Sequence, residues 1–391
     1  MFYLFALLAC LIPFHNGNSE IQVPSSLLSV EEPKLVFELN DLGNGYASPT
    51  VTKDNLFFTG EIDSIGYLYS FDLKGKLKWK TTYGNEWATQ YPGSRSAPTL
   101  VGDLIYTCSG RGDITCFDAE NGVKKWSLNM IKDFEGVEIS FGHSMPLVIE
   151  GDLLFCSPSG EKNNIIALDR FTGKMVWSTP ANRETAGYGS PIVLNMQNQK
   201  ILITSSEFSI LGLNAATGEK LWDYELSFKG DQPCNQSLYD GKYLYWIAGP
   251  GNGAVAAQLS PDGSKINVIW KNKEFDTFFG GFVQIGDYLY GSSDSRREFV
   301  SVDSKSGAIL DSLSFGIGST ILAEDMLILY NQQGKIGLVR PNKEKLELLS
   351  SFRITKGTGE HFSHPVYSNG CLFIRRGNTL QTYNISKNEQ N

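Results

Sequence analysis

The chain has 391 residues, of which 41% are apolar, 12% aromatic and 19% charged, and 40 of them are glycine. This composition is typical of many short strands joined by turns, and it excludes a disordered chain, a coiled coil and a mostly helical protein. The net charge is −8 and no basic cluster occurs. We therefore expect no nucleic-acid partner, because phosphate binding needs concentrated Lys and Arg.

The first predicted element is a secretory signal over residues 1–19. Residues 1–14 are almost wholly apolar, which is too short for a stable membrane anchor but suits the core of a signal peptide. Two processing sites compete: GNS (17–19) is a small-x-small cleavage site, whereas LLAC (7–10) resembles a bacterial lipobox in which Cys10 carries a lipid. Both predict an exported protein, periplasmic, outer-membrane-associated or extracellular, and only a lipid at Cys10 brings it to a membrane. Residues 20–33 are expected to form a linker.

An internal repeat governs the rest of the chain. Five segments share an apolar strand, an Asp or Asn, a Gly turn and a strand with Trp. They are LYSFDLKGKLKW (68–79), ITCFDAENGVKKW (114–126), IIALDRFTGKMVW (165–177), ILGLNAATGEKLW (210–222) and the degraded AAQLSPDGSKINVIW (256–270). FVSVDSKSGAIL (299–310) and IGLVRPNKEKLELL (336–349) keep the shape but lack the Trp.

A second phrase alternates with the first. It consists of an alternating strand, a Gly-Asp-like turn and another strand, and it occurs eight times, from YASPTVTKDNLFFTG (46–60) to SHPVYSNGCLFIRRG (363–377). Together the two phrases give four strands in each period of about 43 residues, which is typical of a propeller blade. A single blade cannot bury its apolar face, so adjacent blades must stack.

The eighth unit supplies only three strands before the chain ends. The missing fourth strand is predicted at the other end, as KLVFELN (34–40), which resembles KKWSLN in the second unit. Pairing these segments closes the ring and removes two free sheet edges. The sequence thus predicts an all-β fold, a single eight-bladed β-propeller of four-stranded antiparallel blades over residues 34–386. An N-terminal strand closes the ring, and residues 387–391 are a tail.

The phrase ALDRFTGKMVW (167–177) resembles the tryptophan-docking repeat of pyrroloquinoline-quinone (PQQ) propellers. This family includes PQQ dehydrogenases, the outer-membrane assembly lipoprotein BamB and uncharacterised exported PQQ-like proteins. The resemblance covers about 34–386 and implies that the repeated Trp packs between blades while Asp and Gly shape the turn. It therefore implies a structural role for Trp79, Trp126, Trp177, Trp222 and Trp270.

The resemblance leaves several functions open. The preferred one is a non-catalytic scaffold at the bacterial cell envelope that binds other envelope proteins or peptides, at a blade edge or on the loops. The alternatives are a PQQ- and Ca²⁺-dependent dehydrogenase of alcohols or sugars, and a glycan- or peptide-binding module. The chain lacks the vicinal Cys pair, the extra length and the haem motif of many such enzymes. We therefore expect no catalytic residue, cofactor or metal, and EDTA-sensitive turnover would reverse that preference.

A binding surface is predicted where the loops between blades meet around the central channel, because loops on a rigid scaffold carry function. The residues just before the first strand of each blade are Tyr46, Arg95, His143, Tyr188, Asn235, Phe279, Ile317 and His364. The longest loops, 82–94 and 130–141, add Trp87, Tyr91, Asp133 and Glu135. Structural alternatives remain: a His ring binding a loop carbonyl, an Arg holding a turn, and aromatic loop packing.

Two further patterns leave alternatives open. Cys108 and Cys116 flank a Gly-rich turn, so they could form a disulfide across a hairpin or be small buried hydrophobes. Asp63, Asp113 and Asp294 lie in turns, where they are solvated or bind a metal. No known catalytic or metal-binding motif occurs.

Overall fold

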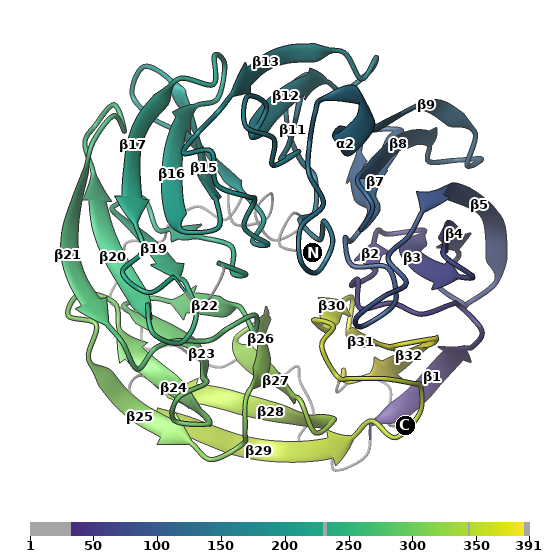
Figure 1. Ribbon diagram of the computed structural model, residues 1–391. Coiled ribbons are helices and arrows are strands. Elements are labelled where there is room, and N and C mark those ends of the chain that lie inside the picture. The colour runs from purple at the N-terminus through teal and green to yellow at the C-terminus, as the bar shows by residue number, and fades with distance from the viewer. Residues whose placement is uncertain (1–32, 230–232, 343–344, 387–391) are drawn as a thin grey trace.

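The computed structural model describes residues 33–229, 233–342 and 345–386. The predicted signal at 1–19 with its possible lipid at Cys10, most of the linker and the tail at 387–391 lie outside the described residues. Within the described part, eight four-stranded antiparallel sheets stand as blades in a ring (Figure 1). The predicted eight-bladed β-propeller is therefore confirmed.

Each blade consists of four strands that follow one another from the centre of the ring outward. Blades 1 to 4 are β2 (Thr50–Val51), β3 (Leu56–Ile62), β4 (Ile65–Phe71), β5 (Leu77–Asn85); β6 (Thr99–Val101), β7 (Leu104–Cys108), β8 (Asp113–Asp118), β9 (Lys124–Asn129); β10 (Val148–Glu150), β11 (Leu153–Cys156), β12 (Ile165–Asp169), β13 (Met175–Thr179); and β14 (Ile192–Asn195), β15 (Lys200–Ser205), β16 (Ser209–Asn214), β17 (Lys220–Glu225). Blades 5 to 8 are β18 (Leu238–Tyr239), β19 (Tyr243–Ile247), β20 (Ala254–Leu259), β21 (Ile266–Asn272); β22 (Phe282–Ile285), β23 (Tyr288–Ser293), β24 (Glu298–Asp303), β25 (Ile309–Leu313); β26 (Gly318–Ala323), β27 (Met326–Asn331), β28 (Lys335–Asn342), β29 (Lys345–Arg353); and β30 (Val366–Ser368), β31 (Cys371–Arg376), β32 (Thr379–Asn384) with β1 (Lys34–Leu39).

The ring closes in the last blade as the sequence predicts. β1 pairs antiparallel with β32, with Lys34 opposite Asn384 and Leu39 opposite Leu380. Figure 1 shows the purple β1 beside the yellow β32 at this closure. Both ends of the chain therefore share one sheet, and β32 has a strand neighbour on each side.

A buried arginine also fastens the closure. Arg375 on β31 is fully buried, and its guanidinium donates to the carbonyls of Gly377 (3.0 Å), Thr59 (2.5 Å) and Gly43 (3.0 Å). Burial lowers the pKa of Arg375 to about 10. Because Thr59 belongs to blade 1 and Gly43 to the segment leading into it, this side chain joins the last blade to the first. No pattern in the sequence indicates this role.

The repeated tryptophans pack against the next blade along the chain. A Cβ atom at Gly122 would lie 2.7 Å from the Trp79 ring, and one at Gly218 would lie 2.4 Å from that of Trp177. The same pairing joins Trp126 to Gly173 and Trp270 to Gly307. The indole N–H of Trp126, Trp177, Trp222 and Trp270 also donates to a carbonyl of the following blade. Gly is required in these turns by both the close approach and a positive φ.

Every outer strand has a β-bulge just before the Trp position. The bulged residues are Val36, Lys78, Lys125, Val176, Leu221, Ile269, Leu310 and Leu349. A bulge bends a strand and interrupts its ladder, so it makes an outer edge a poor template for another strand. Of the two docking modes left open by the sequence, the bulges favour the loops over a blade edge.

The strand register decides between the two alternatives for Cys108 and Cys116. Cys108 lies opposite Ile114 and Cys116 opposite Tyr106, so the thiols do not face each other, and both are free and buried. The interpretation as buried hydrophobes therefore applies, and burial raises the pKa of Cys116 to about 11.

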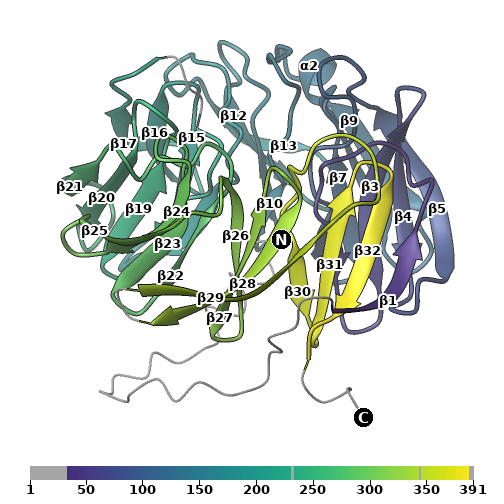
Figure 2. The ribbon, with the colours of Figure 1, turned by 90° about the horizontal axis from the view of Figure 1, so that it is seen from below.

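The predicted long loops are partly regular, because β5 continues to Asn85 and α2 (Met130–Asp133) forms one helical turn at the upper end of the blades in Figure 2.

Candidate functional site

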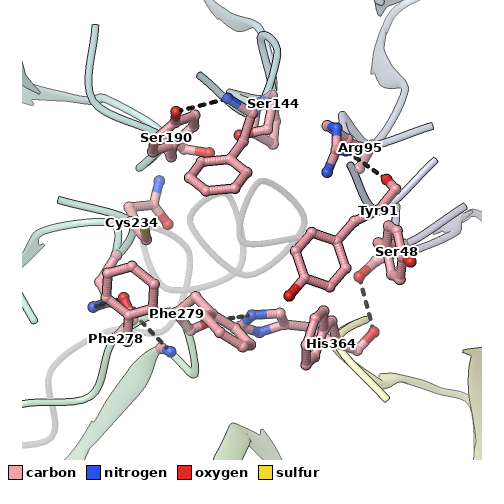
Figure 3. Close-up of a pocket in the computed structure, with 18 of the residues that line it drawn as sticks. Ser48, Tyr91, Arg95, Ser144, Ser190, Cys234, Phe278, Phe279 and His364 are labelled. Atoms are coloured by element: carbon pink, nitrogen blue, oxygen red, sulfur yellow. Dashed lines mark hydrogen bonds between the residues drawn. The ribbon is translucent and has the colours of Figure 1, made fainter. Parts of the chain in front are cut away.

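A cavity of about 640 Å³ lies at the centre of the ring, on the side where the loops between blades emerge (Figure 3). Its volume lies within the range of ligand pockets. Aromatic side chains form much of its wall: Tyr46, Tyr91, Phe141, Tyr188, Phe208, Phe278, Phe279 and Phe362. The charged and polar side chains include Arg95, Glu207, Lys229, Asn235, Gln236 and His364.

The structure brings most of the predicted surface residues together. Tyr46, Tyr91, Arg95, Tyr188, Asn235, Phe279 and His364 line this cavity. Trp87 and His143 are buried outside its lining, and Ile317, Asp133 and Glu135 do not line it either. Four further lining residues were not predicted from the sequence: Phe141, Phe208, Phe278 and Phe362. A signal existed for two of them, since Phe141 and Phe362 each stand two residues before a predicted His.

A chain of aromatic contacts runs along one side of the wall. The Phe362 ring lies 5.9 Å from Tyr91, 5.8 Å from Tyr46 and 5.0 Å from Phe279, measured between centroids. Phe279 in turn meets Phe278 edge-on at 5.7 Å. Edge-on and tilted ring pairs of this kind are favourable contacts. They join loops of blades 1, 5 and 8 into one apolar wall.

His364 and Asn235 hold the Phe278–Phe279 corner in place. His364 Nε2 lies 2.9 Å from the carbonyl oxygen of Phe279, and burial lowers the pKa of His364, so the ring stays neutral and donates this bond. The Asn235 amide donates to the carbonyls of Thr277 (2.7 Å) and Phe278 (3.1 Å) and accepts from the Gly281 N–H (3.0 Å). His364 therefore follows the structural alternative, a ring nitrogen on a loop carbonyl.

Arg95 shapes the loop that presents Tyr91. Its Nη2 donates to the carbonyls of Gln90 (2.8 Å) and Tyr91 (2.5 Å), and its guanidinium lies 5.7 Å from the Trp87 ring. The Trp87 indole N–H donates to the same Gln90 carbonyl at 2.9 Å. Tyr91 has φ 51°, a left-handed conformation that is uncommon for a non-glycine residue. The Arg95 and Trp87 side chains thus support a turn that leaves the Tyr91 ring 46% exposed.

Glu86 anchors this loop from behind. The buried carboxylate accepts hydrogen bonds from the Tyr83 hydroxyl and from the N–H groups of Trp87 (2.7 Å) and Gly110 (2.6 Å). Burial raises the pKa of Glu86 to about 7, although these hydrogen bonds and nearby Arg95 oppose the shift. Since Gly110 belongs to blade 2, Glu86 ties the loop after blade 1 to the next blade.

Phe141 faces the cavity from the second long loop. Its N–H donates to the Tyr188 hydroxyl at 3.2 Å, and the two rings meet edge-on at 6.3 Å. The Phe141 ring is 42% exposed, whereas burial raises the pKa of Tyr188 to about 12. His143 lies buried nearby, and that burial lowers its pKa to about 4. The exposed Phe141 ring therefore packs against a buried, neutral tyrosine.

The chemistry of the wall suits binding better than a metal-dependent reaction. Glu207 is the one carboxylate among the lining residues, and it accepts a hydrogen bond from Thr185 at 2.7 Å. Within the described part of the chain, no group of three or more His, Cys, Asp or Glu side chains is placed to hold a metal ion. Ca²⁺ requires six to eight oxygen ligands, and a metal-bound quinone needs such a site beside it. The residues present do not fit PQQ with Ca²⁺.

Eight four-stranded blades, of which blades 1 to 5 dock on the next blade through a Trp on the outer strand, define a propeller of the PQQ-repeat class. The family model described as outer membrane protein assembly factor BamB matches residues 64–312, more than half of the chain. The chain belongs to this family, as its repeat predicted.

Two relatives match parts of the chain. The outer membrane protein assembly factor BamB of Bordetella pertussis is 23% identical over 299 residues, which cover 71% of this chain and 69% of that protein. The quinoprotein alcohol dehydrogenase PedH of Pseudomonas putida is 23% identical over 150 residues, covering 37% of this chain and 24% of that enzyme.

Two solved structures share the fold. The crystal structure of BamB from Moraxella catarrhalis superposes with a TM-score of 0.67 at 14% identity, covering 92% of this chain and 99% of that one. A europium-containing methanol dehydrogenase superposes with a TM-score of 0.63 at 12% identity, covering 88% and 85%. At these identities the superpositions show the fold alone.

No helix in residues 33–229, 233–342 and 345–386 is long and apolar enough to cross a bilayer.

Proposed function

We propose that this protein is a non-catalytic binding scaffold of the bacterial cell envelope, whose protein partners dock on the loop face at the central cavity. The observation that carries the proposal is the cavity wall itself, which is mainly aromatic and has Glu207 as its one carboxylate. Membership of the BamB family supports a role in the envelope. The bulge in every outer strand supports docking on the loops.

Photocrosslinking in the native host tests the docking face. A photoreactive phenylalanine analogue replaces Phe141, at the cavity, or Val176, which is 53% exposed on the outer strand β13. We expect crosslinks from position 141 to an exported protein, identified by mass spectrometry, and loss of this product when Tyr91→Ala is added. Crosslinks from position 176 alone would place the partner on the perimeter and contradict the proposal.

The export part of the proposal has its own test. Cell fractionation should recover the protein with the envelope, and Cys10→Ser should shift it to the soluble periplasmic fraction if Cys10 carries a lipid. An unchanged membrane association in Cys10→Ser would refute the lipid anchor while leaving export intact. Recovery in the cytoplasm would contradict the envelope role itself.

Reconstitution tests the alternative function. The purified protein is mixed with excess PQQ and either Ca²⁺ or europium, and dye reduction is measured with a panel of alcohols and aldose sugars. We expect no turnover above the buffer blank, because the cavity wall lacks the oxygen ligands that a metal-bound quinone needs. Turnover that EDTA abolishes would replace the scaffold by a dehydrogenase.

A further inference from the structure

We propose that the partner enters the cavity with an extended peptide segment that carries an aromatic side chain beside an acidic one. This inference rests on the proposed function and names the ligand class of the same site. Two features carry it: exposed aromatic rings held at the cavity wall, and an arginine in that wall without a carboxylate partner.

The first feature is the pair Tyr91 and Phe141. Both rings line the cavity, and both remain more than two-fifths exposed although their loops are fixed by hydrogen bonds. Tyr91 follows a turn held by Arg95 and Trp87, and the Phe141 backbone is bonded to Tyr188. Aromatic rings fixed before binding supply a large contact area at little entropic cost. A flat apolar side chain is the group that such rings contact best.

The second feature is the charge of Arg95. Its two hydrogen bonds both use Nη2 and both go to backbone carbonyls, so Nη1 has no hydrogen-bond partner among the described residues. No carboxylate in the described part of the chain lies within 4.0 Å of this guanidinium. Glu86 bonds Tyr83, Trp87 and Gly110 instead. The other lining cation, Lys229, is already paired with Glu225 at 2.7 Å.

A carboxylate on the ligand is the natural complement of this arginine. Charge-assisted bonds between a guanidinium and a carboxylate are among the stronger hydrogen bonds in proteins. The net charge of the whole chain is −8. A positive charge without a carboxylate partner therefore distinguishes the central cavity from the rest of the surface. Aromatic and acidic groups placed side by side would meet Tyr91, Phe141 and Arg95 at once.

The state of the amide side chains favours a peptide over a sugar. Sugar recognition depends on planar polar side chains that are free to bond hydroxyl groups. Here the Asn235 amide is bonded to the 277–281 loop, the Gln236 amide donates to the Pro191 carbonyl at 3.3 Å, and Glu207 accepts from Thr185. The exposed rings and the Arg95 guanidinium are the groups of the wall that an aromatic, acidic peptide would contact.

Labelled peptides test the ligand class with the purified full-length protein. The probes are fluorescein-labelled Gly-Asp-Phe-Asp-Gly, its Asn analogue Gly-Asn-Phe-Asn-Gly and its Ala analogue Gly-Asp-Ala-Asp-Gly, measured by fluorescence anisotropy. We expect the first to bind and each analogue to bind about tenfold more weakly or worse, because one loses the charge and the other the ring. Maltose and cellobiose should give no heat in calorimetry.

Two variants separate the charge of Arg95 from its role in the turn, and a third tests the Tyr91 ring. Arg95→Gln should bind the Asp and Asn peptides equally, whereas Arg95→Lys should keep a preference for Asp; a merely structural role would not move this ratio. Tyr91→Ala should weaken Gly-Asp-Phe-Asp-Gly about tenfold, while Phe171→Ala, in an exposed turn at the other end of blade 3, should leave it unchanged. Thermal melting checks that each variant is folded.

The opposite results would overturn the inference. Equal affinity of the wild type for the Asp and Asn peptides would remove the role of Arg95 charge. Binding of a disaccharide without binding of any peptide would assign the cavity to glycans. If no peptide binds while position 141 still crosslinks to an envelope protein, the ligand class is wrong and the scaffold function stands.

Discussion

Blades 1 to 5 and blades 6 to 8 are joined to their neighbours in different ways. After blades 1 to 5, a Trp on the outer strand packs on the turn of the next blade. After blade 6 the same position is Asp311, whose carboxylate accepts the N–H of Leu346 at 2.8 Å, and the long strand β29 lies against β25. After blade 7 the position is Ser350, and Phe352 meets Tyr383 edge-on at 5.0 Å.

The closing interface between blades 8 and 1 combines both solutions. Phe37 on β1 takes the Trp position, and a Cβ atom at Gly75 of blade 1 would lie 3.1 Å from its ring. Buried Arg375 adds its hydrogen bonds to the same interface. The comparison teaches that the fold requires each blade to dock on the next, while the Trp–Gly pair is one of several ways to do so.

Removal of β1 should have the largest effect on stability. Without Lys34–Leu39 the last blade loses its outer strand, and blades 8 and 1 lose the Phe37 contact as well. We expect a larger fall in melting temperature than for any point variant below, because the edge of β32 and one interface are exposed together. Thermal unfolding followed by circular dichroism measures it. An unchanged melting temperature would show that the ring does not depend on this closure.

Trp177→Ala should show how much a regular interface contributes. The side chain is 8% exposed, packs on Gly218 and donates to the Ala215 carbonyl at 3.1 Å. Large-to-small substitutions in a core of this kind lower the free energy of unfolding by about 3–5 kcal/mol. Urea denaturation measures the change, with Phe171→Ala as the exposed aromatic control. Near-native stability of Trp177→Ala would mean that this position is not part of the core.

Substitutions at the irregular positions should have smaller effects. Asp311→Ala removes the acceptor of the Leu346 N–H, which should lower the free energy of unfolding by about 1–2 kcal/mol. Ser350→Ala removes a side chain that makes no hydrogen bond within the described part of the chain, and we expect a change of less than about 0.5 kcal/mol. The same urea titrations apply. A loss as large as that of Trp177→Ala at either position would contradict the difference in stability between the Trp interfaces of blades 1 to 5 and the interfaces after blades 6 and 7.

At the loop end, opposite the Trp–Gly pairs, three of the interfaces between blades have a further contact. Carboxylates that follow outer strands bind the turn of the next blade: Glu86 bonds the Gly110 N–H, Glu184 bonds the Phe208 N–H, and Asp276 bonds the Ser295 N–H. These contacts join blades 1, 3 and 5 to blades 2, 4 and 6. They lie at the loop end, whereas the Trp–Gly pairs lie at the turns on the other end.

Glu86→Gln should give the smallest effect, a change in pH dependence. Burial raises the pKa of Glu86 to about 7, so the folded protein binds this proton more tightly than the unfolded chain, and Glu86 contributes stability that grows as the pH falls from about 8 to about 5. The variant lacks this gain. The difference in free energy of unfolding, variant minus wild type, should therefore decrease as the pH falls from about 8 to about 5. Urea denaturation at each pH measures this difference.

Taking the difference between variant and wild type removes the histidine contribution. Burial lowers the pKa of His143 to about 4, so acid favours the unfolded chain through this group and opposes the effect of Glu86. Both proteins retain His143, and its contribution cancels. Glu120→Gln, at an exposed position, is the matched control and should follow wild type at every pH. A flat difference for Glu86→Gln would show that Glu86 does not titrate in this interval.

The architecture could be predicted from the sequence alone. Strand alternation, the Gly turns and the Trp repeat are local patterns, so they fixed the number of blades and the partner strand for β1. The same patterns indicated that Trp177 and its equivalents are structural. Most of the cavity wall was also within reach, because in a propeller the residues before each first strand converge by topology.

The role of each residue in the cavity wall could be seen only in the tertiary structure, because its neighbours come from other blades. Arg375 joins the last blade to the first by hydrogen bonds, Trp87 supports the turn that presents Tyr91, and His143 is buried outside the cavity lining. Cys108 and Cys116 were separated by a hairpin register that their spacing does not reveal. Contacts between segments far apart in the chain depend on the angles and packing of whole blades, which no local pattern encodes.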